Sequence, residues 1–237
     1  MEKIISTYSK PEFSIDFGSY INEVFSFIES KLSLFPCYLK KSSVLQNLPK
    51  TIEGENRITE NLCVFLNIHE KGHNYKITKQ DNCSFQFLNQ SSGTGHTTND
   101  SGVIVANTKG NFGKILVIEA KRLPTPGKSR KKEYLFGKLG GIERFRKGTH
   151  GSDVDSDRAI MIGYIQKENK GFWINCLNSW IIEEDSQRKE SELYWKEEDK
   201  IIEDKKFIND SVYKFQSVHN RLTLSKINLI HYWINLT

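Results

Sequence analysis

Apolar residues recur along the chain with two different periods, one typical of helices and the other of strands. Segments 19–33 and 53–69 repeat apolar positions every three or four residues, which predicts two amphipathic helices. Segments 133–148 and 171–183 are also predicted to be helical, the first despite its glycines. Residues 34–50 are predicted to be a polar, lysine-bearing connection. Each predicted helix has an apolar face to bury.

Shorter apolar segments are predicted to be strands, because they are rich in β-branched and aromatic residues and are bounded by turn residues. These segments are 83–90, 101–107, 114–122, 158–166, 212–220 and 226–236. The turn TKGNFG joins the second to the third and predicts a β-hairpin. No repeat or linker is evident. The pattern therefore predicts a single α/β domain over residues 1–237, with a mixed β-sheet flanked by helices and an N-terminal helical extension at 1–50.

The composition is that of a globular protein outside the membrane. Hydrophobic residues make up 37% of the 237 residues and charged residues 27%. No apolar run approaches the roughly 18 residues of a membrane span, and the N-terminus lacks a signal-peptide core, so we expect a cytoplasmic protein with no membrane partner. The four cysteines form no CxxC pair, which argues against a cysteine zinc site.

The charge is unevenly distributed, although the net charge is a mild +5. Residues 121–138 contain seven Lys or Arg and one acid, which suits a polyanionic partner. Residues 183–204 contain ten acids and four bases. The acidic segment is interpreted as a solvated face, with an interface for a partner protein as the alternative.

The strand that leads into the basic segment ends on a carboxylate and an ammonium. In GKILVIEAKRL, Glu119 and Lys121 share one face of the strand because side chains alternate across it. The midpoint between Asp100 and Glu119 falls at the Lys109–Gly110 junction, inside the predicted turn. If the hairpin pairs symmetrically about that point, Asp100 lies opposite Glu119, with Cβ atoms about 4.5–5.5 Å apart. Two carboxylates that close repel each other unless a cation lies between them.

A third acid is predicted on the helix over 53–69. On a helical wheel its apolar stripe spans about 100°, and Glu55 falls inside that stripe, whereas Glu60 falls on the solvent side. Of the two acids, Glu55 is therefore the better candidate to reach a site on the sheet.

Such a cluster suits phosphodiester hydrolysis. Asp100 and Glu119 offer the hard oxygen ligands that Mg²⁺ prefers, with Mn²⁺ as a possible substitute. The metal would activate a water molecule, and Lys121 would position or deprotonate that water and stabilise the transition state.

The ordered set of helix acid, Asp, turn, apolar strand and Glu119-Ala120-Lys121 resembles the PD-(D/E)XK nuclease superfamily over residues 53–165. The resemblance implies a restriction-endonuclease-like fold, DNA cleavage, and Glu55, Asp100, Glu119 and Lys121 as the catalytic set. Asn99 replaces the proline that commonly precedes the aspartate.

The stretch GGIERFRKGTHGSD…AIMIGYI also resembles segments of bacterial nuclease-like proteins associated with phage defence. A homodimer or a partner protein of a defence complex is a further expectation. The candidate nucleic-acid contacts are basic residues of the loop and the helix that follows it, namely Lys128, Arg130, Lys131, Lys132, Arg144 and Arg146. For the two arginines of the helix, a solvated surface position is the alternative.

Two other functions are open. The same fold serves as a catalytically silent nucleic-acid-binding or assembly subunit if the acidic cluster binds no metal. HEKGH at residues 69–73 matches the H-E-x-x-H pattern of zinc peptidases, which needs both histidines on one helix. Here Gly72 is a typical residue for a helix end, and no third histidine follows at the extended spacing, so two solvent-facing histidines are the favoured interpretation.

Overall fold

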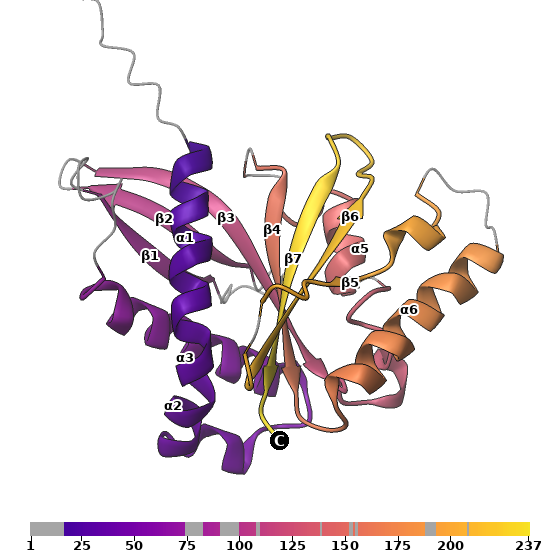
Figure 1. The fold of residues 1–237 in the computed structure, drawn as a ribbon, viewed down its shortest axis with the longest axis horizontal. Helices are drawn as coiled ribbons and strands as arrows, with labels where there is room; N and C mark the ends of the chain where they lie inside the picture. Colours follow the sequence, from indigo (N-terminus) through magenta and orange to yellow (C-terminus); the bar gives the residue numbers. More distant parts are fainter. Residues whose placement is uncertain are drawn as a thin grey trace, which may run out of the picture.

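A computed structural model gives the fold and describes most of the chain (Figure 1). The described residues are 17–73, 83–90, 100–107, 110–137, 139–151, 154, 156–187, 193–207 and 209–237. Seven strands form one mixed sheet in the order β1-β2-β3-β4-β7-β6-β5. The parallel pairs β3–β4 and β4–β7 form its centre, and the remaining pairs are antiparallel.

The elements follow the predicted order closely. The helices are α1 Phe17–Lys31, α2 Phe35–Lys41, α3 Ile52–Glu70, α5 Gly141–Arg146 and α6 Lys170–Ser186. The strands are β1 Cys83–Gln90, β2 Asp100–Asn107, β3 Gly110–Leu123, β4 Arg158–Ile165, β5 Ile202–Glu203, β6 Val212–His219 and β7 Ile227–Asn235. Each predicted strand and three of the four predicted helices are confirmed, to within a few residues at their ends.

Two predictions about elements are wrong. Among the described residues of the helix expected over 133–148, only Gly141–Arg146 are helical, because Gly137 adopts a φ of +97° that interrupts a right-handed helix. The connection expected at 34–50 contains the short helix α2 and the 3₁₀ turn Val44–Asn47, and a second 3₁₀ turn, Leu32–Leu34, directly precedes α2. Pro36 at the start of α2 suits a helix N-terminus, where its missing N–H costs no hydrogen bond.

Helices cover the sheet on both faces. Helices α1, α2 and α3 pack on one face in a core that includes Leu116 and Ile118 of β3. Helices α5 and α6 pack on the other face in a second core that includes Val117 and Leu123. Figure 1 shows the first group in indigo and purple and the second in pink and orange, on opposite sides of the strands. The described part of the N-terminal extension thus shares a core with α3 and the sheet.

A chain of buried polar side chains crosses the second core. It consists of Asp199, His219, Ser217, His231, Tyr134 and Trp233, joined by hydrogen bonds of 2.7–2.9 Å. Asp199 ends the chain as a pure acceptor, and Trp233 Nε1–H begins it as a pure donor. Every hydrogen bond is therefore donated in the direction from Trp233 toward Asp199. Each histidine then carries one ring proton, which lies on Nδ1 of His219 and on Nε2 of His231.

Contacts near both ends of this chain support α5. The backbone N–H groups of Gly141 and Ile142 donate to the carbonyls of Glu133 and Tyr134. At the other end, the guanidinium of Arg146 lies 3.7 Å from Asp199 Oδ2. Helix α5 is thereby held in place, and it is the helix that carries Arg144 to the site described next.

Candidate active site

The site forms where β3 extends beyond its pairing with β2. The last described pair is Ser101 with Ile118, whereas β3 continues to Leu123. On its other side β3 stays paired with β4 through Leu123. At this edge α3 supplies a partner, because Glu55 Oε2 accepts a 3.0 Å hydrogen bond from the backbone N–H of Arg122. A helix side chain thus satisfies an edge donor of the sheet.

The register of the hairpin agrees with the predicted opposition of Asp100 and Glu119. These residues each lie one position beyond the pair Ser101–Ile118. Next to the turn, Asn107 pairs with Gly110, a register centred one residue earlier than predicted. Two irregularities in the pairing then shift the register to the predicted one near the site. The side chain of Asp100, and therefore its role, lies outside the described residues.

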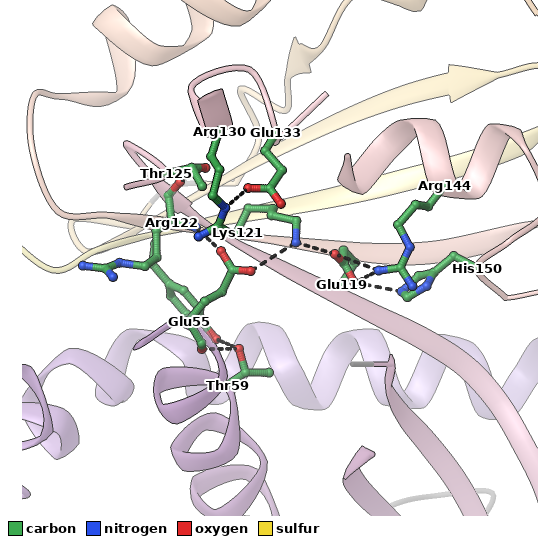
Figure 2. A network of polar contacts seen from close by, with 11 residues as sticks. Glu55, Thr59, Glu119, Lys121, Arg122, Thr125, Arg130, Glu133, Arg144 and His150 are labelled. Atoms are coloured by element: carbon green, nitrogen blue, oxygen red, sulfur yellow. Dashed lines mark hydrogen bonds and ion pairs between the residues drawn. The ribbon is translucent and has the colours of Figure 1, made fainter. Parts of the chain in front are cut away.

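Lys121 lies between two carboxylates, as Figure 2 shows. Its Nζ is 2.8 Å from Glu119 Oε1 and 3.1 Å from Glu55 Oε1. All three residues are buried, with exposed fractions of 2–3%. Glu119 and Lys121 share a face because they are two positions apart on one strand, and Glu55 reaches them from α3 past the end of β2. Glu55, Glu119 and Lys121 therefore lie together around Lys121 Nζ, as predicted.

Glu119 has two further partners that come from α5 and the loop after it. Arg144 Nη1 is 3.5 Å from both carboxylate oxygens, and His150 Nε2 is 2.8 Å from Oε2. Both residues are buried. Gly148 and Gly151, on either side of His150, adopt φ values of +69° and +70°, which few other residues tolerate. The turn that they allow directs His150 back toward the sheet.

The surroundings set the protonation states in the site. Burial alone would raise the pKa of Glu119, but Lys121, His150 and Arg144 outweigh it and hold that pKa well below the ordinary value. Burial alone would lower the pKa of Lys121, but Glu119 and Glu55 outweigh it and raise that pKa above the ordinary value. Burial raises the pKa of Glu55 against the opposing effect of Lys121. Lys121 is therefore a cation at neutral pH and suited to stabilise charge, not to act as a base.

A small pocket opens onto this cluster. It is lined by Ile52, Glu55, Asn56, Thr59, Asn89, Glu119, Ala120, Lys121, Leu139 and Arg144. Its volume is about 20 Å³, which is room for one water molecule or ion. The pocket wall carries both carboxylates, the ammonium and two side-chain amides. It is therefore polar, and it has room for a metal ion or for one attacking water.

The donors at this pocket fit Mg²⁺ better than a softer metal. Carboxylate and amide oxygens are hard ligands, and the described residues hold no group of three or more His, Cys, Asp or Glu arranged around a metal. Mg²⁺ needs no such group, because it is usually bound by one or two carboxylates together with substrate phosphates and water. Glu119 fits as one ligand, on the condition that it gives up one of its present partners.

The side chains predicted to contact nucleic acid differ in their exposure and in their partners within the protein. Lys131 is exposed, with Nζ 5.6 Å from the ring of Trp180. Arg130 pairs with Glu133 at 2.5 Å, Lys132 pairs with Glu183 at 2.9 Å, and the side chain of Lys128 lies outside the described residues.

Arg144 and Arg146 are buried. Arg146 lies with its Cζ 4.1 Å from the ring centre of Trp195 and donates a 2.8 Å hydrogen bond to the carbonyl of Tyr194. The alternative expectation, solvated arginines on an exposed helix face, is therefore wrong for both residues. Arg146 is engaged within the protein, whereas Arg144 borders the pocket.

The HEKGH segment lacks the geometry of a zinc-peptidase helix. Helix α3 ends at Glu70, so His69 is helical and His73 lies beyond the helix end. The ring of His69 packs 4.5 Å from that of Phe65, and the ring of His73 packs 5.1 Å from that of Phe27. The carboxylate of Glu70 accepts a hydrogen bond from the backbone of β1. The two histidines thus pack on different aromatic side chains.

The sequence analysis did not identify His150 or the pocket residues Asn56, Thr59 and Asn89. A signal for His150 exists in hindsight, since a histidine between two glycines shortly after a helix is typical of a tight, directed turn. The amides of the pocket carry no comparable local signal.

Comparison of the chain with protein-family models, with curated proteins and with solved structures finds no match. Among the described residues, no helix is both long and apolar enough to cross a bilayer. The described fold and site define an α/β protein with a buried Glu–Lys–Glu cluster that opens to a polar pocket.

Proposed function

We propose that this chain is a metal-dependent endonuclease that hydrolyses phosphodiester bonds of DNA, with a restriction-endonuclease-like core. The observation that carries the proposal is the meeting of Glu55 with Glu119 and Lys121 at one pocket, across 66 residues of sequence. A surface ion pair, the simplest alternative for a Glu-x-Lys strand, does not account for three buried charges around a water-sized space.

In this proposal Glu119 holds the metal ion, with Asp100 as its expected second ligand. A bound divalent metal lowers the pKa of a water molecule and offsets negative charge on the reacting phosphate. Lys121 donates from Nζ to the attacking water or to a phosphate oxygen. Glu55 keeps Nζ in place through its 3.1 Å contact and fixes the strand edge through Arg122. Exposed Lys131 would contact the DNA backbone.

The test is cleavage of plasmid and of DNA and RNA oligonucleotides, in Mg²⁺, Mn²⁺ or EDTA. Wild type is compared with Lys121→Ala and Glu119→Ala, and with Lys147→Ala as a matched control. Lys147 lies just after α5, is half exposed and pairs with Glu143 outside the pocket. We expect metal-dependent DNA cleavage that the first two substitutions abolish and the control retains. Cleavage that survives both substitutions would place the active site elsewhere.

The second candidate is a catalytically silent nucleic-acid-binding subunit. It is favoured by one observation, that both oxygens of Glu119 already have nitrogen partners within 3.5 Å. This alternative predicts nucleic-acid binding that is unaffected by EDTA and by Lys121→Ala. A role in prokaryotic phage defence, as a dimer or with a partner protein, accords with either candidate and remains a proposal.

A further inference from the structure

The three partners of Glu119 differ in how firmly they hold it. Lys121 and His150 approach the carboxylate to 2.8 Å, whereas Arg144 stays 3.5 Å from both oxygens. The side chain of Arg144 is also the most exposed of the three, at 10% against 4% for Lys121 and 0% for His150. Arg144 lines the pocket and His150 does not. Arg144 is therefore the partner best placed to leave Glu119.

The cations beside Glu119 weaken its attraction for a metal ion. The carboxylates of Glu55 and Glu119 at most balance the cations of Lys121 and Arg144. A divalent ion at Glu119 would lie close to these two positive side chains, which weakens its Coulomb attraction there even with Asp100 as a second ligand. Movement of Arg144 away from Glu119, together with arrival of a phosphate, would change that balance in favour of the metal.

We infer that Arg144 occupies the metal's place at Glu119 in the free protein and moves to a phosphate of the nucleic acid when the substrate binds. Metal and nucleic acid then bind cooperatively, because the phosphate draws away the guanidinium that competes with the metal. The inference rests on the proposed function and adds to it a device that keeps the site closed to metal until substrate is present.

The fold allows this movement without displacement of a helix. Helix α5 is fixed by the backbone hydrogen bonds of Gly141 and Ile142 and by the contacts of Arg146 with Tyr194 and Asp199. The change is therefore a rotation of one long side chain. Arginine suits both positions, since its planar group pairs with carboxylates and with phosphates in similar geometry.

The experiment measures Mn²⁺ affinity directly, by electron paramagnetic resonance of the free ion, with and without a short DNA duplex whose phosphorothioate linkages resist hydrolysis. In wild type we expect the duplex to raise Mn²⁺ affinity on the order of tenfold, and Mn²⁺ to raise duplex affinity by the same factor. In Arg144→Gln the free protein should bind Mn²⁺ about tenfold more tightly than wild type, and the effect of the duplex should largely disappear.

Lys147→Gln is the matched control, because it removes the same charge immediately after the same helix and should leave Mn²⁺ affinity unchanged. Arg144→Lys keeps the charge and should keep the cooperativity, which preserves the test if the glutamine variant does not fold. Mn²⁺ binding that is independent of both the duplex and Arg144 overturns this inference alone. Absence of Mn²⁺ binding in every protein, with and without duplex, overturns the proposed metal-dependent nuclease as well.

Discussion

The backbone N–H of Arg122 donates a 3.0 Å hydrogen bond to Glu55 Oε2, at the edge of β3 beyond its last described pair with β2. The other carboxylate oxygen of Glu55 contacts Lys121 Nζ. One helix side chain therefore completes the sheet edge and orients the central cation of the site. Glu55 therefore contributes to the stability of the fold and, in the proposed function, to the activity of the site.

Loss of the Glu55 carboxylate should destabilise the protein strongly. Glu55→Ala leaves a buried ammonium and a backbone donor with fewer partners, and we expect the free energy of unfolding to fall by about 3 kcal/mol. Glu55→Gln retains an acceptor and should cost less. Glu53→Ala, at an exposed position of the same helix, should change stability by less than about 0.5 kcal/mol. Urea denaturation measures all three, and equal effects of the two alanine variants would contradict this role of Glu55.

Substitutions of Arg146 and Lys131 should show that the first cation serves stability and the second binds DNA. Arg146→Met removes buried contacts with Tyr194 and Asp199, so we expect a loss of about 2–3 kcal/mol in stability with little change in duplex affinity. Lys131→Ala should leave stability nearly unchanged, weaken duplex binding, and reduce the slope of log affinity against log salt by about 1. Fluorescence anisotropy at several salt concentrations measures the slope. An unchanged slope in Lys131→Ala would remove this lysine from the DNA contacts.

The two histidines of the buried polar chain should make the protein sensitive to mild acid. Burial lowers the pKa of His219 and, more strongly, that of His231 below the ordinary 6.5. The unfolded chain therefore binds more protons than the folded one below pH 6.5, and stability falls as the pH decreases from there. The slope is at most about 1.4 kcal/mol per pH unit for each histidine. Around His219 the charged groups are Asp199 and Arg146, and the titratable groups next to His231 are Tyr134, whose hydroxyl is 2.9 Å from Nδ1, and His219.

The measurement is urea denaturation at pH values from about 7.5 to about 5.5. Glu55 acts with the opposite sign, because its raised pKa lets the folded protein bind a proton first. The series is therefore repeated in Glu55→Gln, which removes the opposing contribution of Glu55 and leaves that of the histidines with a lowered pKa, namely His219, His231 and the less buried His73. A free energy of unfolding that stays constant over this range in the variant would contradict the neutral, hydrogen-bonded state of the two histidines.

A side chain at Gly163 should destabilise the protein. It pairs with Lys121 in the sheet, and a Cβ at this position would lie 2.5 Å from Trp233 Cδ1. We expect Gly163→Ala to cost about 1–3 kcal/mol through overpacking and to lower activity, because β4 supports the strand that carries the site. Gly72→Ala is the matched control, since a Cβ there has no neighbour within 4 Å. Thermal unfolding of the two variants compares them, and equal melting temperatures would show that the sheet adapts to the added methyl group.

The sequence predicted correctly those features that depend on local periodicity. The apolar stripe of α3 placed Glu55 toward the core, and alternation along β3 placed Glu119 and Lys121 on one face. The hairpin register near Asp100 also agrees, although it arises from a shorter turn and two pairing irregularities that no local pattern indicated. Gly137 shows the converse, because its left-handed backbone interrupts a helix that the apolar spacing alone predicted.

The sequence by itself therefore determined which side of each element carries the charged residues, since helix and strand geometry repeat every few residues along the chain. Only the tertiary structure decided which partners those charges meet. Arg144 and His150 reach Glu119 because α5 packs over the end of β3, and Arg146 of the same helix is directed to Asp199 instead. Such pairings depend on contacts between segments distant in sequence, and no local period specifies them.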